Sequence, residues 1–418
     1  MASSNLSDGT LRVLVVGAGI GGLTAALALR RQGHQVLIFE RSKFNSEVGA
    51  AIHIAPNSTR ILRRLGMEPL KHGGTNLQEV RMYDGQGQFR KKIPIVLPEN
   101  NEWYLIHRAG LHSAIKSLAI SDDGEGPPAR LFLGCDIIEL DKSHPSITLR
   151  GGEKYSGDLI VGADGVNSWT RSYIAPDAKP YSTGVCCYRW MRPWDSFSKD
   201  PLTEEYGRCE GAFLEWLEGD KRLVCYPCDD HKTANIAAFV PSAEVEGRKY
   251  GWDGEASKTA MLKSFKDWSM GPRRILEQAK EDFKVWELMD MKNLDTWTSD
   301  RLVLLGDAAH PFLPYAGQGG AMAIEDGVCL GALLPRGSIS PDEISERLQW
   351  FEKCRRGRVE RVLAYTRRNG NDPNDPIEPR PSPEESAKMI EYCNNHDEWE
   401  SATNKLEKFK AGELVQAF

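Results

Sequence analysis

A glycine-rich turn near the start of the chain constrains the fold more than any other feature of its 418 residues. Residues 17–22 read GAGIGG and follow a β-branched apolar run, residues 11–16, which is typical of a strand buried on both faces. Apolar residues recur at helical spacing over residues 20–31, and residues 35–39 form a second predicted strand. The pattern predicts a β-α-β unit of about 30 residues, the size that a dinucleotide-binding fold requires.

Each glycine of this turn has its own physical role. Gly17 permits the tight turn after the strand, Gly19 lets a pyrophosphate approach the backbone, and Gly22 lets the helix pack close to the strand. The phosphates then lie at the helix N-terminus, where free N–H groups and the helix dipole favour an anion. Glu40 ends the second strand, where a carboxylate accepts both ribose hydroxyls and disfavours a 2′-phosphate. The alternative is a glycine turn without a ligand, but strand, helix and terminal acid together favour an FAD-like or NAD-like dinucleotide.

A second segment near the other end of the chain points to a flavin. Residues 306–311 read GDAAHP, and a loop of glycines and one glutamine follows: Gly317, Gln318, Gly319 and Gly320. In this 306–320 loop, glycines let backbone N–H groups approach a flat ring, and a helix predicted over residues 318–334 favours negative charge there. Asp307 can serve as a cofactor ligand or as a helix N-cap, and we expect the former. For His310 we expect a structural role in the turn before the proline.

The length and composition of the chain fit a large globular protein. A chain of 418 residues exceeds what one hydrophobic core usually organises, and its content of 40% hydrophobic and 27% charged residues is ordinary for a soluble protein. The net charge of −6 gives no reason to expect nucleic acid or an anionic membrane as a partner. Residues 11–29 are apolar but broken by glycines, so we expect no signal peptide and no membrane span, and a cytoplasmic location.

The nine cysteines form an odd and scattered set, which fits reduced thiols in a cytosolic protein. Cys225 and Cys228 have a spacing that zinc sites use, but a second Cys/His pair with matching spacing is missing from the sequence. We therefore interpret both as small buried hydrophobic residues in strands and expect no metal site.

The chain changes character twice along its length. From about residue 180 to 295, strand-like runs alternate apolar with polar or aromatic residues, as in a half-covered antiparallel sheet. Residues 301–305 return to the pattern of a buried strand. Charged helices are predicted over residues 341–369 and 383–409, with a Pro/Asp-rich linker at 371–383 between them. Further predicted elements are a helix at 109–119 and strands at 103–106, 131–140, 155–161, 184–190, 212–216, 223–226 and 234–240.

Several of these stretches together resemble one enzyme family, the single-component (class A) flavoprotein aromatic monooxygenases, and most closely its salicylate-hydroxylase-like members, many of them fungal. The matching stretches occur in the family's order: 17–22 with Glu40-Arg41, 49–66, His107-Arg108, 162–171 and 301–327. The resemblance implies an α/β fold in which a Rossmann-like FAD-binding domain is interrupted by an antiparallel β-sheet substrate domain and followed by a C-terminal helical tail. The implied divisions are 1–180 (FAD-binding, first part), 181–295 (substrate sheet), 296–340 (FAD-binding, return) and 341–418 (helical region).

The resemblance also implies which residues hold FAD. Glu40 is assigned to the adenosine ribose, Arg41 and Arg108 to the phosphates and sugars, and Asp307 to the ribityl or ribose hydroxyls. The full set of implied cofactor residues is Gly17, Gly19, Gly22, Glu40, Arg41, Ala51, Arg108, Asp164, Gly165, Asp307, Gly317, Gln318, Gly319 and Gly320. Asp164 and Gly165 belong to a motif linked to both FAD and the nicotinamide cofactor.

The implied activity is hydroxylation of a phenolic or related aromatic substrate with O₂ and with NADPH or NADH as a transient co-substrate, with or without decarboxylation. A second G-x-G-x-x-G after a predicted strand is missing, which disfavours disulfide reductases and Baeyer–Villiger oxygenases. Two alternatives stay open. One is a secondary-metabolite oxygenase that hydroxylates or epoxidises a larger polycyclic or prenylated substrate, and the other is a non-catalytic binding protein on the same fold. We expect a monomer or a homodimer.

Candidate substrate residues come from the predicted sheet and from the 306–320 loop. Arg189 or Arg192 can pair with a substrate carboxylate or phenolate, because an unpaired buried guanidinium is costly. The alternative is a surface arginine that caps the sheet. Tyr226 lies on a neighbouring predicted strand and Tyr315 within the loop. His53 is either a proton relay or a hydrogen-bonded structural residue, and we favour the latter. Four more aromatic residues are candidates for packing on the substrate ring, but for each we favour a place in the core: Phe213, Trp216, Phe239 and Phe312.

Overall fold

The glycine-rich turn lies at the carboxyl end of the central strand of a six-stranded sheet. The computed structural model describes residues 9–43, 50–245, 257–280, 283–337, 339–370 and 379–413. The strand order is β18-β19-β12-β1-β2-β8, parallel except for β18 at one edge. From β1 the chain continues to β2 and β8 on one side of it, and to β12 and β19 on the other side. Ligands of open α/β sheets bind at such a switch point, outside the carboxyl ends of the strands. The strands are β1 (Arg12–Val16), β2 (Gln35–Glu40), β8 (Arg130–Leu133), β12 (Leu159–Gly162), β18 (Thr298–Ser299) and β19 (Leu302–Leu304).

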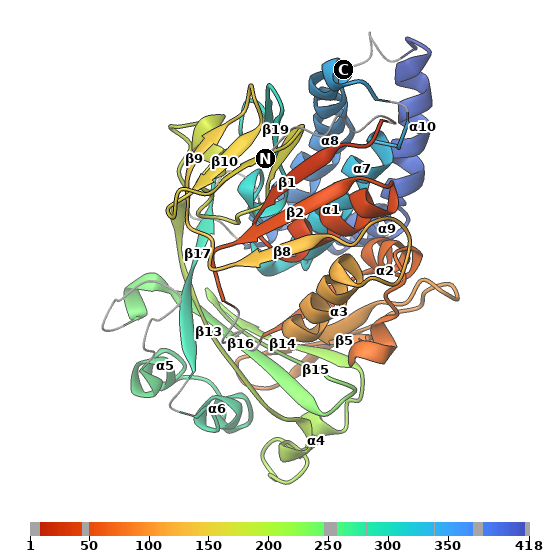
Figure 1. Ribbon diagram of the computed structural model, residues 1–418. Coiled ribbons are helices and arrows are strands. Elements are labelled where there is room, and N and C mark those ends of the chain that lie inside the picture. The colour runs from red at the N-terminus through yellow and green to blue at the C-terminus, as the bar shows by residue number, and fades with distance from the viewer. Residues whose placement is uncertain are drawn as a thin grey trace.

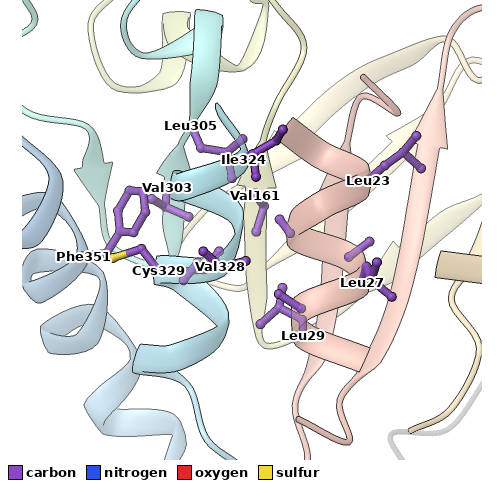
Figure 2. Packing of buried hydrophobic residues seen from close by; sticks show 14 of the residues in the cluster. Leu23, Leu27, Leu29, Val161, Val303, Leu305, Ile324, Val328, Cys329 and Phe351 are labelled. Atoms are coloured by element: carbon purple, nitrogen blue, oxygen red, sulfur yellow. The ribbon is translucent and has the colours of Figure 1, made fainter. Parts of the chain in front are cut away.

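Two helices from opposite ends of the chain pack side by side on this sheet. Figure 2 shows α1 (Ile20–Arg31) and α7 (Gly319–Leu333) side by side, with Leu29 on the side of α1 nearer α7 and Val161 of a strand behind the two helices. Glycines on α7 allow the close approach, because a Cβ on Gly327 would lie 2.7 Å from the backbone nitrogen of Ala25. The predicted strands at 11–16 and 35–39 and the predicted helices at 20–31 and 318–334 are confirmed, with ends shifted by one residue.

A seven-stranded sheet lies below the first one in Figure 1. Its order is β17-β13-β16-β15-β14-β5-β6, and its pairs are antiparallel except for β14 with β5. The strands are β5 (Glu79–Asp84), β6 (Phe89–Pro94), β13 (Tyr181–Pro193), β14 (Ala212–Glu218), β15 (Lys221–Cys228), β16 (Thr233–Pro241) and β17 (Lys284–Asp290). The four strands predicted between 184 and 240 are confirmed. Residues 79–94, which the sequence analysis left outside the sheet, complete one of its edges.

Both faces of this sheet are used, so the expectation of a half-covered sheet is wrong. One face packs on α5 (Lys258–Ser264) and α6 (Met270–Glu277) through Met261 and Ile275 in a core of its own. The opposite face looks toward the 306–320 loop. Side chains alternate between the faces along each strand: Leu214 and Trp216 are buried in the core, and the intervening residues face the other way.

Two predicted strands are each split by a glycine. Residues 131–140 form β8 and β9 (Ile137–Asp141) because Gly134, at φ +69°, turns the chain from the main sheet into a three-stranded one. Residues 155–161 likewise divide into β11 (Lys154–Ser156) and β12. The small sheet has the order β11-β10-β9, with β10 spanning Ser146–Leu149.

A second small sheet has the order β3-β7-β4. Its strands are β3 (Ala51–Ile54), β4 (Thr75–Asn76) and β7 (Tyr104–His107). The helices α2 (Pro56–Arg64) and α3 (Arg108–Ile120) follow β3 and β7 in the chain.

The C-terminal part is helical, as predicted. It consists of α8 (Ile344–Gly370), α9 (Pro383–Asn394) and α10 (Glu398–Lys410). The predicted helix at 383–409 is interrupted because the Asp397 side chain accepts a hydrogen bond from the Glu400 N–H and caps a new helix. Residues 371–378 of the predicted linker lie outside the described residues. Within the described ranges, no helix combines the length and apolar character needed to cross a membrane.

A buried cluster of charged side chains joins α7, α8 and α10. Arg355 of α8 is fully buried and contacts three carboxylates: Glu325 at 2.8 Å, Asp326 at 2.7 Å and Glu398 at 2.6 Å. Arg358 adds a second cation: its Nε and its Nη2 each donate a hydrogen bond to a carboxylate oxygen of Glu325. Burial alone would raise the pKa of Glu325, but Arg358 and Arg355 outweigh it and lower this pKa to about 2. We call these five residues the Arg355 cluster.

The Arg355 cluster also fixes the 306–320 loop. One Asp326 oxygen accepts hydrogen bonds from the Gly306 N–H at 2.9 Å and pairs with His310 Nε2 at 2.7 Å. Asn57 Nδ2 donates to Glu325 and to the Gln318 side chain. Both ends of the loop are thereby tied to adjacent residues of one helix. The structural role expected for His310 is confirmed, through a buried acid and not through a capped turn.

Replacing the central cation of the cluster is expected to be severely destabilising. Arg355→Met leaves three buried carboxylates with too few cations, and a broken buried ion pair costs about 3–5 kcal/mol. The free energy of unfolding, measured with urea, should fall by that amount. The matched control is Arg208→Met, which removes an exposed pair with Glu204 and should cost less than about 1 kcal/mol. Equal losses for the two variants would contradict the structural importance of the cluster.

Candidate active site

A cavity of about 1020 Å³ lies between the 306–320 loop and the seven-stranded sheet. Its wall contains all four predicted substrate residues and eight predicted cofactor residues: His53, Arg189, Tyr226, Tyr315, Gly19, Ala51, Arg108, Gly165, Asp307, Gly317, Gly319 and Gly320. The predicted residues that do not line it are Gly17, Gly22, Glu40, Arg41, Asp164 and Gln318. The structure thus brings together residues from both ends of the chain and from the sheet between them.

The three glycines of the turn differ in what surrounds them. Gly17 has φ +103°, and a Cβ there would lie 2.4 Å from the Ala163 carbonyl oxygen. A Cβ on Gly22 would lie 2.1 Å from the Gly17 carbonyl oxygen, so this glycine lets the helix pack on the turn. Gly19, in contrast, lines the cavity, and a Cβ there would meet no described atom within 4 Å. The open side of Gly19 is where a ligand can touch the backbone.

Glu40 is held in place at the end of β2 by backbone N–H groups. Its Oε2 accepts a hydrogen bond from the Ala18 N–H at 2.8 Å, and its Oε1 accepts one from the Ser42 N–H at 2.7 Å. Each carboxylate oxygen has a second lone pair, so hydroxyl donors can still bind. Arg41 follows as an exposed residue.

Asp307 faces the cavity from the other wall. Its carboxyl is accessible through the cavity but surrounded by protein, and this desolvation raises its pKa, against the opposing effect of His310, Arg108 and Arg171. The buried Arg171 donates to the backbone oxygens of Asp307 and Ala308 at 3.0 and 2.8 Å. Arg171 lies within the 162–171 stretch, but the sequence analysis gave it no role, because a buried arginine that binds carbonyls has no sequence signature. Asp307 therefore offers its carboxylate to the cavity from a rigid backbone.

Asp164 and Gln318 lie behind the cavity wall. The Asp164 carboxylate accepts four hydrogen bonds from Ser168, Trp169 and Thr170, all between 2.6 and 2.9 Å, and so shapes its own turn. Its neighbour Gly165, at φ +80° and with no described atom within 4 Å of an added Cβ, is the residue that lines the cavity. The Gln318 side chain is buried against Asn57. For both residues the side chain positions a loop, and the adjacent glycines face the cavity.

Arg189 lies on the cavity face of the sheet, which excludes the alternative of a surface arginine that caps the sheet. Its Nε is buried and has no hydrogen-bond partner among the described residues. The other candidate, Arg192, is three residues further along the strand and therefore faces the opposite side, where its side chain binds Ser196 and Gln278. Arg192 is thus excluded from the cavity. Asn235, for which no role was predicted, also lines the cavity. Its buried Nδ2 has no hydrogen-bond partner in the described ranges, and its Oδ1 accepts from the Ala51 N–H at 3.0 Å.

His53 lies in an aromatic cage, and the expectation of a hydrogen-bonded structural histidine is wrong. Its ring is 5.0 Å from the Tyr226 ring, 5.3 Å from Phe213 and 5.9 Å from Trp103, and its buried Nδ1 has no partner in the described part of the chain. Desolvation, aided by the nearby Arg189 charge, lowers the pKa of His53 to about 4. His53 is therefore neutral at physiological pH.

Three of the aromatic candidates line the cavity while packing on a core: Phe239 belongs to a buried cluster, and Phe213 and Phe312 pack against buried clusters. The strand period of two places Phe213 on the cavity side, because it alternates with core residues on β14, whereas Trp216 faces the core as expected and stacks on Tyr83. Tyr226 donates its hydroxyl to the Ala51 carbonyl at 3.1 Å, and burial raises its pKa further above the ordinary value. Cys225 and Cys228 face opposite sides of their sheet, in separate cores, so they do not form a metal-type pair.

Comparison with known proteins assigns the chain to a family. A family model described as an FAD binding domain matches residues 10–364, which span the glycine turn, the sheet and the 306–320 loop. The chain belongs to this family. A hispidin-3-hydroxylase from Neonothopanus nambi is 34% identical over 384 residues, covering 85% of this chain and 88% of the relative. The FAD-dependent monooxygenase cfoG from Aspergillus candidus is 32% identical, covering 84% and 83%. The chain is therefore a flavoprotein monooxygenase of the aromatic hydroxylase type, as the resemblance implied.

Solved structures share the fold of this flavoprotein. CtdE in complex with FAD and substrate 4 superposes with a TM-score of 0.82 at 23% identity, covering 97% of this chain and 99% of that one. A salicylate hydroxylase substrate complex gives a TM-score of 0.75 at 24% identity, covering 95% and 98%. The α/β fold with an inserted sheet and a helical C-terminal region is thus confirmed.

The geometry of the cavity fits FAD. Gly19 and Gly165 present open backbone where the cofactor's phosphates and sugars approach, and Arg108 lines the same wall. The first turn of α7 begins at Gly319 without a side-chain cap, so its free N–H groups and dipole face the cavity and favour negative charge. Asp307 offers a carboxylate for hydroxyl groups. This set of donors and acceptors complements a flavin with its ribityl chain and pyrophosphate.

Alanine substitutions of Gly22 and Gly19 should affect different properties, the first the stability of the fold and the second the binding of the cofactor. Gly22→Ala forces a Cβ against the backbone of Gly17, and we expect the apoprotein to lose about 1–3 kcal/mol of unfolding free energy. Gly19→Ala, with extended backbone and open space, should leave the apoprotein at least as stable but weaken FAD binding about tenfold, or 1.4 kcal/mol. Urea unfolding and quenching of FAD fluorescence measure the two effects. A stable Gly22→Ala, or unaltered FAD affinity in Gly19→Ala, would contradict these assignments.

The low pKa of His53 predicts a pH-dependent stability difference. The unfolded chain binds a proton at this residue near pH 6.5 and the folded chain only near pH 4, so this residue's contribution to stability rises with pH across that interval. Between pH 8 and pH 5, wild-type protein should lose about 2 kcal/mol of unfolding free energy relative to His53→Gln. Urea titrations of both proteins at the two pH values test this. Parallel pH dependence in the two proteins would show that His53 is not desolvated.

Proposed function

We propose that this flavoprotein hydroxylates a phenolic aromatic substrate with O₂ and NADH or NADPH. In this reaction a ring C–H becomes C–OH, the second oxygen atom leaves as water, and the nicotinamide supplies two electrons. Three buried polar atoms without partners among the described residues carry the proposal: Arg189 Nε, Asn235 Nδ2 and His53 Nδ1. All three residues line the cavity, and two of the atoms are donors, so the missing ligand presents acceptor oxygens.

FAD is held by the backbone of Gly19 and Gly165, by Arg108 and by Asp307, with Glu40 at the adenosine ribose. When bound, FAD would supply the activated oxygen for this reaction, with electrons from the nicotinamide co-substrate. The protein's own tasks are to bury the ring, to exclude water and to orient the reacting carbon. Phe213 and Phe239 cover the ring from the sheet, and Tyr315 covers it from the loop.

Arg189 is the group that stabilises phenolate. A phenol reacts faster as phenolate, so some group must favour the anion. With a pKa of about 4, His53 is too weak a base to remove a phenol proton at neutral pH. Tyr226 is a hydroxyl donor whose raised pKa keeps it neutral. The guanidinium of Arg189 therefore lowers the pKa of the bound phenol electrostatically, and His53 positions the oxygen by a hydrogen bond.

Relatives support an aromatic substrate without fixing its identity. Beside the hispidin-3-hydroxylase, a 3-amino-4-hydroxybenzoate 2-monooxygenase from Streptomyces platensis is 29% identical, covering 88% of this chain and 90% of the relative. The first name describes a hydroxylase, and the second describes oxygenation of a ring that carries a hydroxyl group. A larger secondary metabolite remains the second candidate because several fungal relatives are named only as FAD-dependent monooxygenases. Decarboxylation during hydroxylation requires a carboxylate on the reacting carbon, and Arg189 suits such a substrate equally well.

We also infer a cytoplasmic monomer or homodimer. All nine cysteines are buried, and none forms a disulfide bond in the described part of the chain, which suits a reducing compartment. For the domain divisions, we propose that the substrate domain comprises residues 79–94 together with 181–295, since β5 and β6 extend the same sheet. The flanking parts, 1–180 without those strands and 296–340, form the FAD-binding domain, and 341–418 form the helical region.

Purified protein should show a yellow flavin spectrum and oxidise NADH or NADPH in the presence of phenolic acids, with formation of hydroxylated product. Arg189→Ala should raise the Kd of an anionic phenol at least about tenfold and retain FAD, because the guanidinium faces the substrate side. Arg192→Ala, on the opposite face of the strand, is the matched control and should leave this Kd unchanged. A protein that cannot be loaded with FAD would refute the proposed function. Equal loss of FAD and of phenol binding in Arg189→Ala would refute only the role of Arg189.

A further inference from the structure

The cavity follows the seven-stranded sheet across nearly its whole width. Strand register places one residue from each of six neighbouring strands in a single transverse row, and all six line the cavity: Arg189, Ala237, Val224, Glu215, Met82 and Lys91. Five strand spacings of about 4.8 Å separate the ends of this row, which gives a length of about 24 Å. A single phenolic ring occupies only a fraction of that length.

The 306–320 loop covers only the inner part of this row. Tyr315 approaches the sheet at Phe239, with ring centroids 5.8 Å apart, and at Arg222, whose guanidinium lies 4.9 Å from its ring. These contacts fall on β16 and β15. Beyond these contacts the cavity wall includes residues of β14, β5 and β6, and also residues of α9 and of the segment just before it. We call this part the outer subsite: Met82, Lys91, Ile93, Leu217, Arg380 and Ile390.

The outer subsite is apolar with an excess of positive charge. Met82, Ile93 and Leu217 form its floor on the sheet. At its inner edge Arg222 pairs with Glu215 at 3.1 Å, so these two charges cancel. Arg380 and Lys91 form no ion pair with any described residue. Desolvation is the largest effect on the pKa of Arg380 and lowers it; Arg222 lowers this pKa further, whereas Glu215 and Tyr315 oppose the shift. The remaining charge is two cations around an apolar floor.

We propose that the outer subsite binds the distal, acidic end of an elongated aromatic substrate whose reacting ring lies beside Arg189; this proposal rests on the proposed function. A conjugated, flat molecule of two or more rings matches the length of the row. Ala237 and Val224 have small side chains, so they leave space above the sheet between the charged residues at the two ends of the row. A carboxylate or acidic hydroxyl at the far end meets Arg380 and Lys91. The nicotinamide co-substrate also carries anionic groups, so the test includes it as a competing occupant.

Binding to the FAD-loaded protein tests the proposal without turnover, through the change in flavin absorbance. The probes are 4-hydroxybenzoate, trans-4-hydroxystilbene and trans-4′-hydroxystilbene-4-carboxylate. Wild-type protein should bind the stilbene carboxylate at least about tenfold more tightly than the benzoate, since the added apolar area is buried. Ala387, an exposed residue of α9 on the cavity wall, allows the subsite to be filled without disturbing a core. Ala387→Trp should weaken both stilbenes about tenfold or more and the benzoate less than about twofold.

A second set of variants tests the charge. Arg380→Gln should weaken the stilbene carboxylate about threefold to fivefold and leave the neutral stilbene unchanged, as expected for a half-exposed ion pair. Arg380→Lys should restore most of the loss. Lys71→Gln, which removes an exposed lysine outside the cavity, is the matched control.

Three results would overturn the outer subsite. Wild-type protein could bind benzoate and the stilbenes with equal affinity, or Ala387→Trp could weaken the binding of all probes equally. In the third, the Arg380 variants would change the KM for NADH or NADPH and leave the affinity for the stilbene carboxylate unchanged. Hydroxylation is scored separately on the bound probes. Selective binding of the long probes without any hydroxylated product would count against the proposed function and leave the binding site for elongated acids supported.

Discussion

The flavin side of the active site depends on the electrostatics of one buried arginine. Arg355 brings together carboxylates from α7 and α10, and one of them, Asp326, holds the Gly306 N–H next to Asp307, which lines the cavity. Burying such charges is costly, and their geometry compensates only when every partner is present. The conformation of the 306–320 loop therefore depends on Arg355 of α8, a helix that follows it in the chain. This explains why a chain with a complete dinucleotide fold carries a long helical tail: the tail supplies counter-charge to the site.

The Arg355 cluster also shows why ligand-type side chains do not make a metal site here. Glu325, His396 and Glu398 place potential ligand atoms within 4.8 Å of one another. The Arg355 guanidinium contacts both carboxylates, at 2.8 and 2.6 Å, and so already provides the positive charge that a metal ion would bring. The cluster is therefore a structural ion-pair network, and its effect on the chemistry is to position the loop.

The local periodic signals in the sequence predicted most of the fold. The first β-α-β unit and the helix after the 306–320 loop were correct to within a residue because their apolar periods and glycines act locally. The strands at 79–94 were missed because their place in the sheet is set by a non-local parallel pairing with β14. The split at Gly134 was missed because one glycine at positive φ redirects a continuous apolar run.

The glycines of the cavity wall were easier to predict than its side chains for a similar reason. Glycine motifs report on close backbone approach, and Gly19 and Gly165 do line the cavity with open backbone, whereas the side chain of Asp164 shapes its own turn. Substrate residues depend on which face of a strand they occupy. Sequence left Arg189 and Arg192 as alternatives, and only the observed register separated them. Asn235 and Arg171 gave no signal, since their partners are backbone groups distant in sequence.

The alternation of faces along the seven-stranded sheet has a consequence for how this enzyme type diversifies. On β14, residues 213, 215 and 217 face the cavity, and residues 212, 214 and 216 face the core. Glu215 and Leu217 can therefore be exchanged without altering the core on the opposite face, whereas Val224, Tyr226, Ala237 and Phe239 also pack together on the cavity side. Natural variation can change the ligand that such a sheet binds through the positions that lie outside both cores. One scaffold can thus serve many metabolic pathways while its cofactor chemistry stays the same.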